Sequence, residues 1–206
     1  MLTTHSGFSL FVDYDLGVNL DAMLSKLQKE IESDHKILDQ GEDEYTATKI
    51  KQHQISPLVL HTDKITVSEQ EVMVPGGFFP SGFIDVEESG ESYSKTAFVF
   101  HLPFEGDLQL LKCRPSSFLM WTEEISVSNN EINFEIINFN NDVSAIQKER
   151  DQFLSRLQEQ VLNINNDVNR HNSKIESHIR AAIKMGKDKF KTQSDIISKL
   201  GNPRRQ

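Results

Sequence analysis

Cysteine is almost absent from this chain of 206 residues, which contains only Cys113. One cysteine cannot form an intramolecular disulfide, so a disulfide-stapled scaffold and a cysteine-rich zinc site are both excluded. A lone cysteine between Lys112 and Arg114 invites the idea of an activated thiolate. Strand alternation would point both cations away from the sulfur, so we predict a structural cysteine in a reducing compartment.

Long hydrophobic runs are also missing. No stretch approaches the roughly 18 consecutive apolar residues that a membrane-spanning helix needs. The start, "MLTTHSGFSLFVDYD", has no basic segment followed by an apolar one, so it does not read as a signal peptide. With 37% hydrophobic and 26% charged residues, the composition is that of a folded chain. We expect a soluble, cytoplasmic protein without a membrane partner.

Motifs for cofactors, metals and catalysis are not evident. The loop "PGGFFPSGF" has neither the Gly-x-Gly-x-x-Gly spacing nor a Gly-Lys-Ser/Thr ending of phosphate-binding loops. His171 and His178 would share a helix face, but about 10 Å apart along the axis, too far for one metal ion. We therefore predict no cofactor, no metal and no catalytic residue. An enzyme whose site is assembled from residues distant in sequence stays open.

The first 140 residues alternate between strand and helix patterns. Asn19 is a candidate cap for a helix whose apolar residues recur every three or four positions, fading near Gly41. Short strands follow, and the clearest hairpin is "EISVSNNEINFEII" with Asn129-Asn130 at its turn. We predict an α+β body over residues 1–140, with a mixed or antiparallel sheet and the early helix packed on it.

Helical periodicity returns in residues 141–206, with Asn141 or Asp142 as the cap. A continuous helix here would be about 60 to 70 Å long, more than a small body can cover. The Asn-rich stretch "NINNDVNRHN" leaves a break or a hairpin open. We predict a long, coiled-coil-like extension whose apolar stripe meets a second copy or another protein. The predicted interface comprises Val143, Ile146, Leu157, Val161, Ile164 and Val168.

Charge is distributed unevenly along the chain. Residues 170–206 contain ten Lys or Arg and three Asp or Glu, a net charge of +7, whereas the whole chain carries -9. A basic tail on an acidic body favours contact with a polyanion or with an acidic partner surface. A cationic helix stripe could follow the phosphates of a nucleic acid, the alternative function. It comprises Arg180, Lys184, Lys187 and Lys191.

Three stretches carry a resemblance to a known family. They are "PFEGDLQLLKCRPSSF", "NRHNSKIESHIRAAI" and "DIISKLGNPRRQ", between Pro103 and Arg205. They resemble the N-terminal region of bacterial proteins that carry a C-terminal restriction-endonuclease-like domain implicated in defence against foreign DNA. The matching residues are Gly106, Asp107, Arg114, Pro115, Ser116, Leu200, Gly201 and Pro203, and none has a catalytic role in that family.

The resemblance implies a non-catalytic module of a defence-related system, because the nuclease carboxylates and lysine would lie in a domain that this sequence does not include. Such a module would oligomerise, sense or dock a partner. Together with the apolar stripe, this predicts an interaction module that binds a partner or another copy through its C-terminal helix. A charge at both Leu157 and Ile164 should then dissociate the assembly and leave the body folded.

Overall fold

The computed structural model describes residues 7–80 and 91–200, which divide into two compact units. Unit 1 combines residues 1–14 with 57–165, and unit 2 combines 15–56 with 166–206. The chain therefore crosses between the units at three places, none of them near residue 140. The α+β class is confirmed, with an antiparallel sheet and a long C-terminal helix.

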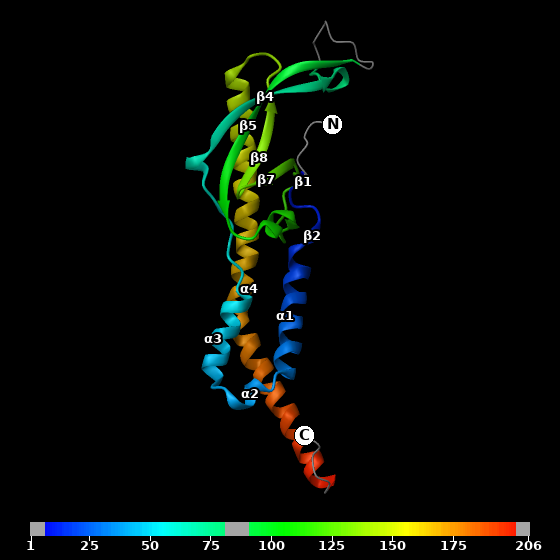
Figure 1. Ribbon diagram of the computed structural model, residues 1–206, viewed down its shortest axis with the longest axis vertical. Helices are drawn as coiled ribbons and strands as arrows, with labels where there is room; N and C mark the ends of the chain where they lie inside the picture. Colours follow the sequence, from blue (N-terminus) through cyan, green and yellow to red (C-terminus); the bar gives the residue numbers. More distant parts are fainter. Residues whose placement is uncertain (1–6, 81–90, 201–206) are drawn as a thin grey trace. The chain divides into compact units, whose positions relative to one another are not determined.

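Unit 1 is built on a six-stranded sheet in which every described strand pair is antiparallel. The order is β1-β7-β8-β5-β3, and β4 pairs with the other part of β5 (Figure 1). The strands are β1 (Phe8–Ser9), β3 (Val59–Leu60), β4 (Thr66–Pro75), β5 (Ser92–Glu105), β7 (Glu124–Ser128) and β8 (Glu131–Ile137). The short elements are β2 (Tyr14–Asp15), η1 (Thr62–Lys64), η2 (Gly76–Phe78), η3 (Leu108–Lys112) and β6 (Cys113–Arg114).

The β7–β8 hairpin has the turn that the sequence predicts. Asn129 and Asn130 have φ angles of 53° and 60°, the left-handed values that a two-residue hairpin turn requires. This turn fixes the register and places Ser126 opposite Asn133. The predicted hairpin is confirmed.

One face of the sheet packs against α4 (Val143–Leu200). The ring of Phe134 on β8 stacks on Phe153 of α4, with 3.8 Å between the ring centroids. In Figure 1 the first part of α4 runs along the sheet, as this contact requires. Because alternate strand residues point to opposite faces, Asn133 and Glu135 project from the other side. Around Phe134 the sheet therefore has an apolar face toward α4 and polar side chains on the opposite face.

The helix α4 is continuous from Val143 to Leu200, so the hairpin alternative is wrong. Its start follows the predicted chemistry, because Asp142 Oδ1 accepts hydrogen bonds from the backbone N–H groups of Ser144 and Ala145, at 2.9 and 3.1 Å. The first part of α4 belongs to unit 1 and the second to unit 2.

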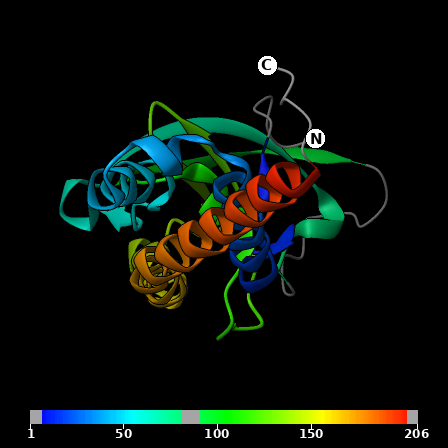
Figure 2. The ribbon, with the colours of Figure 1, turned by 90° about the horizontal axis from the view of Figure 1, so that it is seen from below.

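Unit 2 is helical and contains α1 (Leu16–Ser33), α2 (Lys36–Asp39), α3 (Glu42–His53) and the second part of α4. Figure 2 views these helices from below. Asp15, rather than Asn19, caps α1 by accepting from the Val18 N–H at 3.0 Å. The core cluster contains Leu27, Ile31, Ile37, Tyr45, Ile175, Ile179, Ala182 and Ile183. The early helix therefore packs on the second part of α4 within unit 2, whereas the sequence pattern predicted a contact with the sheet.

Candidate functional site

The predicted interface residues lie in two different environments. Leu157, Val161, Ile164 and Val168 are between 0 and 6% exposed. Residues of the same chain already cover them, so they offer no free surface to a second chain. Val143 is 66% exposed, and Ile146 is half-buried. Only the first turn of the predicted apolar stripe is therefore accessible.

The predicted basic stripe faces an acidic turn within unit 2. Arg180 lies 3.0 Å from Asp43, and Lys187 lies 3.0 Å from Glu42, both in the first turn of α3. Glu176, one turn before Arg180, adds a bond at 3.0 Å. The pKa of the Arg180 guanidinium is raised by these hydrogen bonds to Glu176 and Asp43. Half of the predicted stripe is thus paired inside the chain.

The other half of the stripe is open. Lys184 and Lys191 are exposed, and within residues 7–80 and 91–200 no acid pairs with either. Ile196 and Leu200 follow on α4 and are 54% and 67% exposed. The terminal basic residues Arg204 and Arg205 lie outside the described part of the chain.

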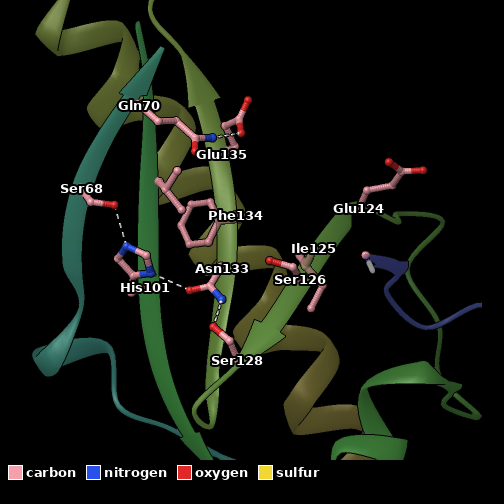
Figure 3. A pocket seen from close by; sticks show the side chains of 12 residues that line it. Ser68, Gln70, His101, Glu124, Ile125, Ser126, Ser128, Asn133, Phe134 and Glu135 are labelled. Atoms are coloured by element: carbon pink, nitrogen blue, oxygen red, sulfur yellow. Dashed lines mark hydrogen bonds between the residues drawn. The ribbon is translucent and has the colours of Figure 1, made fainter. Parts of the chain in front are cut away.

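A polar groove lies on the face of the sheet opposite α4 (Figure 3). Its volume is about 310 Å³, and its walls come from β4, β5, β7 and β8. The lining residues are Gly7, Ser68, Gln70, Val99, His101, Glu124, Ile125, Ser126, Ser128, Asn133, Phe134 and Glu135. The groove lies wholly within unit 1.

A chain of hydrogen bonds crosses the floor of this groove. Ser68 Oγ lies 2.8 Å from Nε2 of His101, and Nδ1 of His101 lies 2.6 Å from Oδ1 of Asn133. Asn133 Nδ2 in turn donates to Ser128 Oγ at 3.0 Å. Figure 3 shows the four side chains in this order across three neighbouring strands and β7 at the far side. Asn133 is buried, and Ser68 is exposed at the groove's rim.

A second hydrogen bond closes one end of the groove. Gln70 Nε2 donates to Glu135 Oε2 at 2.7 Å. Burial raises the pKa of the Glu135 carboxyl, and the bond from Gln70 acts in the opposite direction. The Glu135 carboxyl therefore accepts a proton at a higher pH than an ordinary glutamate does.

Sequence reasoning missed this groove because its members are scattered along the chain. Strand register brings them together: His101 is directly opposite Asn133, and Ser68 is a diagonal neighbour of His101, since it pairs with Val99. The available signal was polar residues at alternate positions of "TVSEQEV" and "EINFEII". A single sequence does not say which strands are neighbours.

Cys113 is buried, and its Sγ donates to the carbonyl oxygen of Gln109 at 3.3 Å. The preceding residues form the 3₁₀ helix η3 rather than the expected strand. Among the described residues, no group of three or more His, Cys, Asp or Glu could hold a metal ion. No helix in that part of the chain is long and apolar enough to cross a bilayer.

No family model, curated protein or solved structure matches this chain.

Proposed function

We propose that this chain is an interaction module of a bacterial, defence-related system in the cytoplasm. Its partner site is the end of α4, residues 184–200, and the partner is an acidic protein surface. The observation that carries the proposal is the exposed apolar pair Ile196 and Leu200 beside unpaired lysines. The bacterial, defence-related context comes from the resemblance to nuclease-linked proteins.

The apolar pair supports a protein partner. Ile196 and Leu200 are four residues apart and so share one helix face. A short helical end gains little stability from its own hydrogen bonds, because helices derive most of their stability from packing. Covering this face with a partner would bury both side chains and stabilise the last turns of α4.

The charge supports an acidic partner over a second copy. Residues 184–200 contain five lysines and two aspartates, a net charge of +3. Two such ends packed together would bring like charges into contact, which disfavours self-association. An acidic surface would instead pair with Lys184 and Lys191 and would attract the helix over a longer range.

A binding experiment with a defined probe tests this site. The probe is a glutamate-rich amphipathic helical peptide, compared with a scrambled peptide of the same composition. We expect the full chain to bind the amphipathic peptide at least tenfold more tightly than the scrambled one. The double substitution Ile196→Ser and Leu200→Ser should abolish that preference, whereas Val143→Ser, at an equally exposed position at the other end of α4, should preserve it.

Light scattering separates the acidic partner from self-association. We expect a mass near 23.6 kDa for the chain without the peptide. If the chain instead has a multiple of that mass, and the double substitution Ile196→Ser and Leu200→Ser returns it to the mass of one chain, then the site binds a second copy and not an acidic partner. Equal affinities for the two peptides in a monomeric chain would contradict the proposed site.

Phage plating tests the defence context. In cells that carry the full system, the same double substitution should reduce protection while the amount of protein stays constant. Val143→Ser is the matched control and should keep protection. If both variants protect the cells as well as the parent does, the end of α4 has no role in defence.

A nucleic acid is the second candidate partner, because Lys184 and Lys191 are exposed and unpaired in the described chain. In this case Glu42 and Asp43 compete with phosphates for Lys187 and Arg180. The double substitution Glu42→Gln and Asp43→Asn should then tighten duplex DNA binding. It should also steepen the slope of log affinity against log salt concentration by the equivalent of about two phosphate contacts. Glu44→Gln, a neighbouring exposed acid, is the control. An affinity that does not change between about 50 and 200 mM salt would remove this candidate.

A further inference from the structure

We propose that the groove of unit 1 is an acyl-transfer site in which Ser68 is the nucleophile, His101 the general base and Asn133 the positioning residue. This inference concerns the groove on the sheet face opposite α4 and does not depend on the end of α4. The sequence alone leaves open whether the chain is an enzyme, and this groove is where such an active site would lie.

The hydrogen-bond directions fix the state of His101. The side-chain oxygen of Asn133 can only accept, so Nδ1 of His101 carries the proton in the 2.6 Å bond. Nε2 then carries a lone pair and accepts the hydroxyl proton of Ser68 at 2.8 Å. A serine hydroxyl bonded to an imidazole lone pair, with the other ring nitrogen bonded to a third group, is the arrangement that activates serine nucleophiles.

The positioning residue is held rigidly. Asn133 is 9% exposed and lies on β8, directly opposite His101 on β5. Its amide nitrogen donates to Ser128 Oγ at 3.0 Å, which fixes the orientation of the amide group. His101 therefore keeps one ring orientation, and the exposed Ser68 hydroxyl is directed by a group that cannot turn away.

The reaction follows from these positions. Ser68 Oγ attacks the carbonyl carbon of an ester while its proton passes to His101 Nε2. The bond from that carbon to the leaving oxygen breaks, and His101 returns the proton to the departing alcohol. Water then attacks the acyl carbon while His101 takes its proton. The bond from that carbon to Ser68 Oγ breaks, His101 returns the proton to Oγ, and the carboxylic acid leaves. The sum is hydrolysis of one ester bond by one water, without an oxidant or a reductant.

Gln70 is the donor that we assign to the developing oxyanion. It lies two residues from Ser68 on the same face of β4. Its amide uses one N–H in the bond to Glu135 and retains a second. Each donor aimed at the oxyanion of an acyl-transfer reaction contributes roughly 10²–10³ in rate.

The groove selects the charge of its substrate. Glu124 and Glu135 line it, and none of its described lining residues is a lysine or arginine. Anionic esters and phosphates are therefore disfavoured, whereas a neutral or cationic ester fits. The open volume of about 310 Å³ suits a small acyl group with part of its alcohol.

Covalent labelling of the full chain tests the site. The probe is a neutral fluorophosphonate, which reacts with activated serines, and the site of attachment is read by peptide mass spectrometry. We expect one phosphonylated serine, Ser68, and no labelling of the Ser68→Ala variant. Ser92→Ala is the control, because Ser92 is an exposed serine of β5 that is not among the lining residues of the groove, and it should leave the labelling rate unchanged.

Two further variants address His101 and Asn133. His101→Gln should lower the labelling rate at least a hundredfold, since it removes the base. Asn133→Asp keeps an acceptor for Nδ1 and should label within tenfold of the parent, whereas Asn133→Leu should be much slower. Circular dichroism at the labelling temperature shows which variants are folded. No labelling of the folded parent chain, or equal rates for parent and His101→Gln, would reduce the four residues to a structural hydrogen-bond chain and overturn the proposal.

Discussion

The side chain of Asn165 binds both backbone groups of Leu58. Its Nδ2 donates to the Leu58 carbonyl oxygen at 2.8 Å, and the Leu58 N–H donates to its Oδ1 at 2.8 Å. Asn172, seven residues later on α4, makes the same two bonds to Ile55, at 3.1 and 2.8 Å. These asparagines are therefore bonded to an extended segment instead of competing with their own helical backbone, which explains how α4 continues through an Asn-rich stretch.

We expect Asn165→Ala and Asn172→Ala each to lower the free energy of unfolding by about 2 kcal/mol, because two backbone groups lose their partners. Chemical denaturation followed by circular dichroism measures the change. Asn169→Ala is the matched control, since Asn169 is exposed on the same helix and should be neutral or slightly stabilising. Equal effects at Asn169 and Asn165 would mean that the bonds to Leu58 contribute nothing.

A charge at Leu157 or Ile164 tests whether the apolar stripe is core or interface. Both side chains are 0% exposed, so Leu157→Asp or Ile164→Asp should prevent folding rather than dissociate an assembly. Loss of the cooperative thermal transition is the expected readout. Leu162→Asp, which changes a 60% exposed leucine on α4, should keep that transition. A folded Leu157→Asp chain with a lower solution mass would restore the original interface prediction.

Gly186 marks a close approach in unit 2. A Cβ there would lie 2.6 Å from Cδ1 of Ile37 and 3.1 Å from Cα of Glu32. Gly186→Ala should therefore destabilise by about 1–2 kcal/mol, although alanine normally favours a helix. Ile37→Val removes the closest atom, so Gly186→Ala should cost less in that background. Denaturation of the parent, the two single variants and the double variant gives the coupling energy between Gly186 and Ile37. If the two changes in the free energy of unfolding simply add, the clash does not involve Ile37 Cδ1.

His171 gives unit 2 a pH dependence. It is buried, and its Nδ1 has no hydrogen-bond partner in the described chain. Burial lowers its pKa, helped by His178 and Lys174 and opposed by Asp21. The unfolded chain therefore binds the proton first, so stability is complete above a pH of about 6.5 and falls as the pH drops below it.

The variant His171→Leu should flatten this dependence. We expect the parent to lose more stability between pH 8 and pH 5 than His171→Leu does, measured by denaturation at both pH values. His35→Leu, which changes an exposed histidine of unit 2 that is not among the groups shifting the pKa of His171, is the control and should follow the parent. A parallel pH dependence in all three chains would assign the effect to other groups.

Local patterns were sufficient for several elements. The Asn129-Asn130 turn was predictable because its positive φ angles are a property of the residue type. The cap at Asp142 was predictable for the same reason, since a carboxylate satisfies free N–H groups at a helix start. The helix α3 was not anticipated, because its acidic start resembles a loop and its apolar face is weak.

The sequence by itself determined the fold class, the β7–β8 hairpin and the helical character of residues 143–200, because each depends on spacing between near neighbours. Tertiary structure decided which side of each element is covered. It buried Leu157 and Ile164 within the chain, paired Arg180 with Asp43, and placed Ser68 beside His101. Those outcomes depend on strand register and helix packing between residues far apart in the chain, which periodicity does not encode.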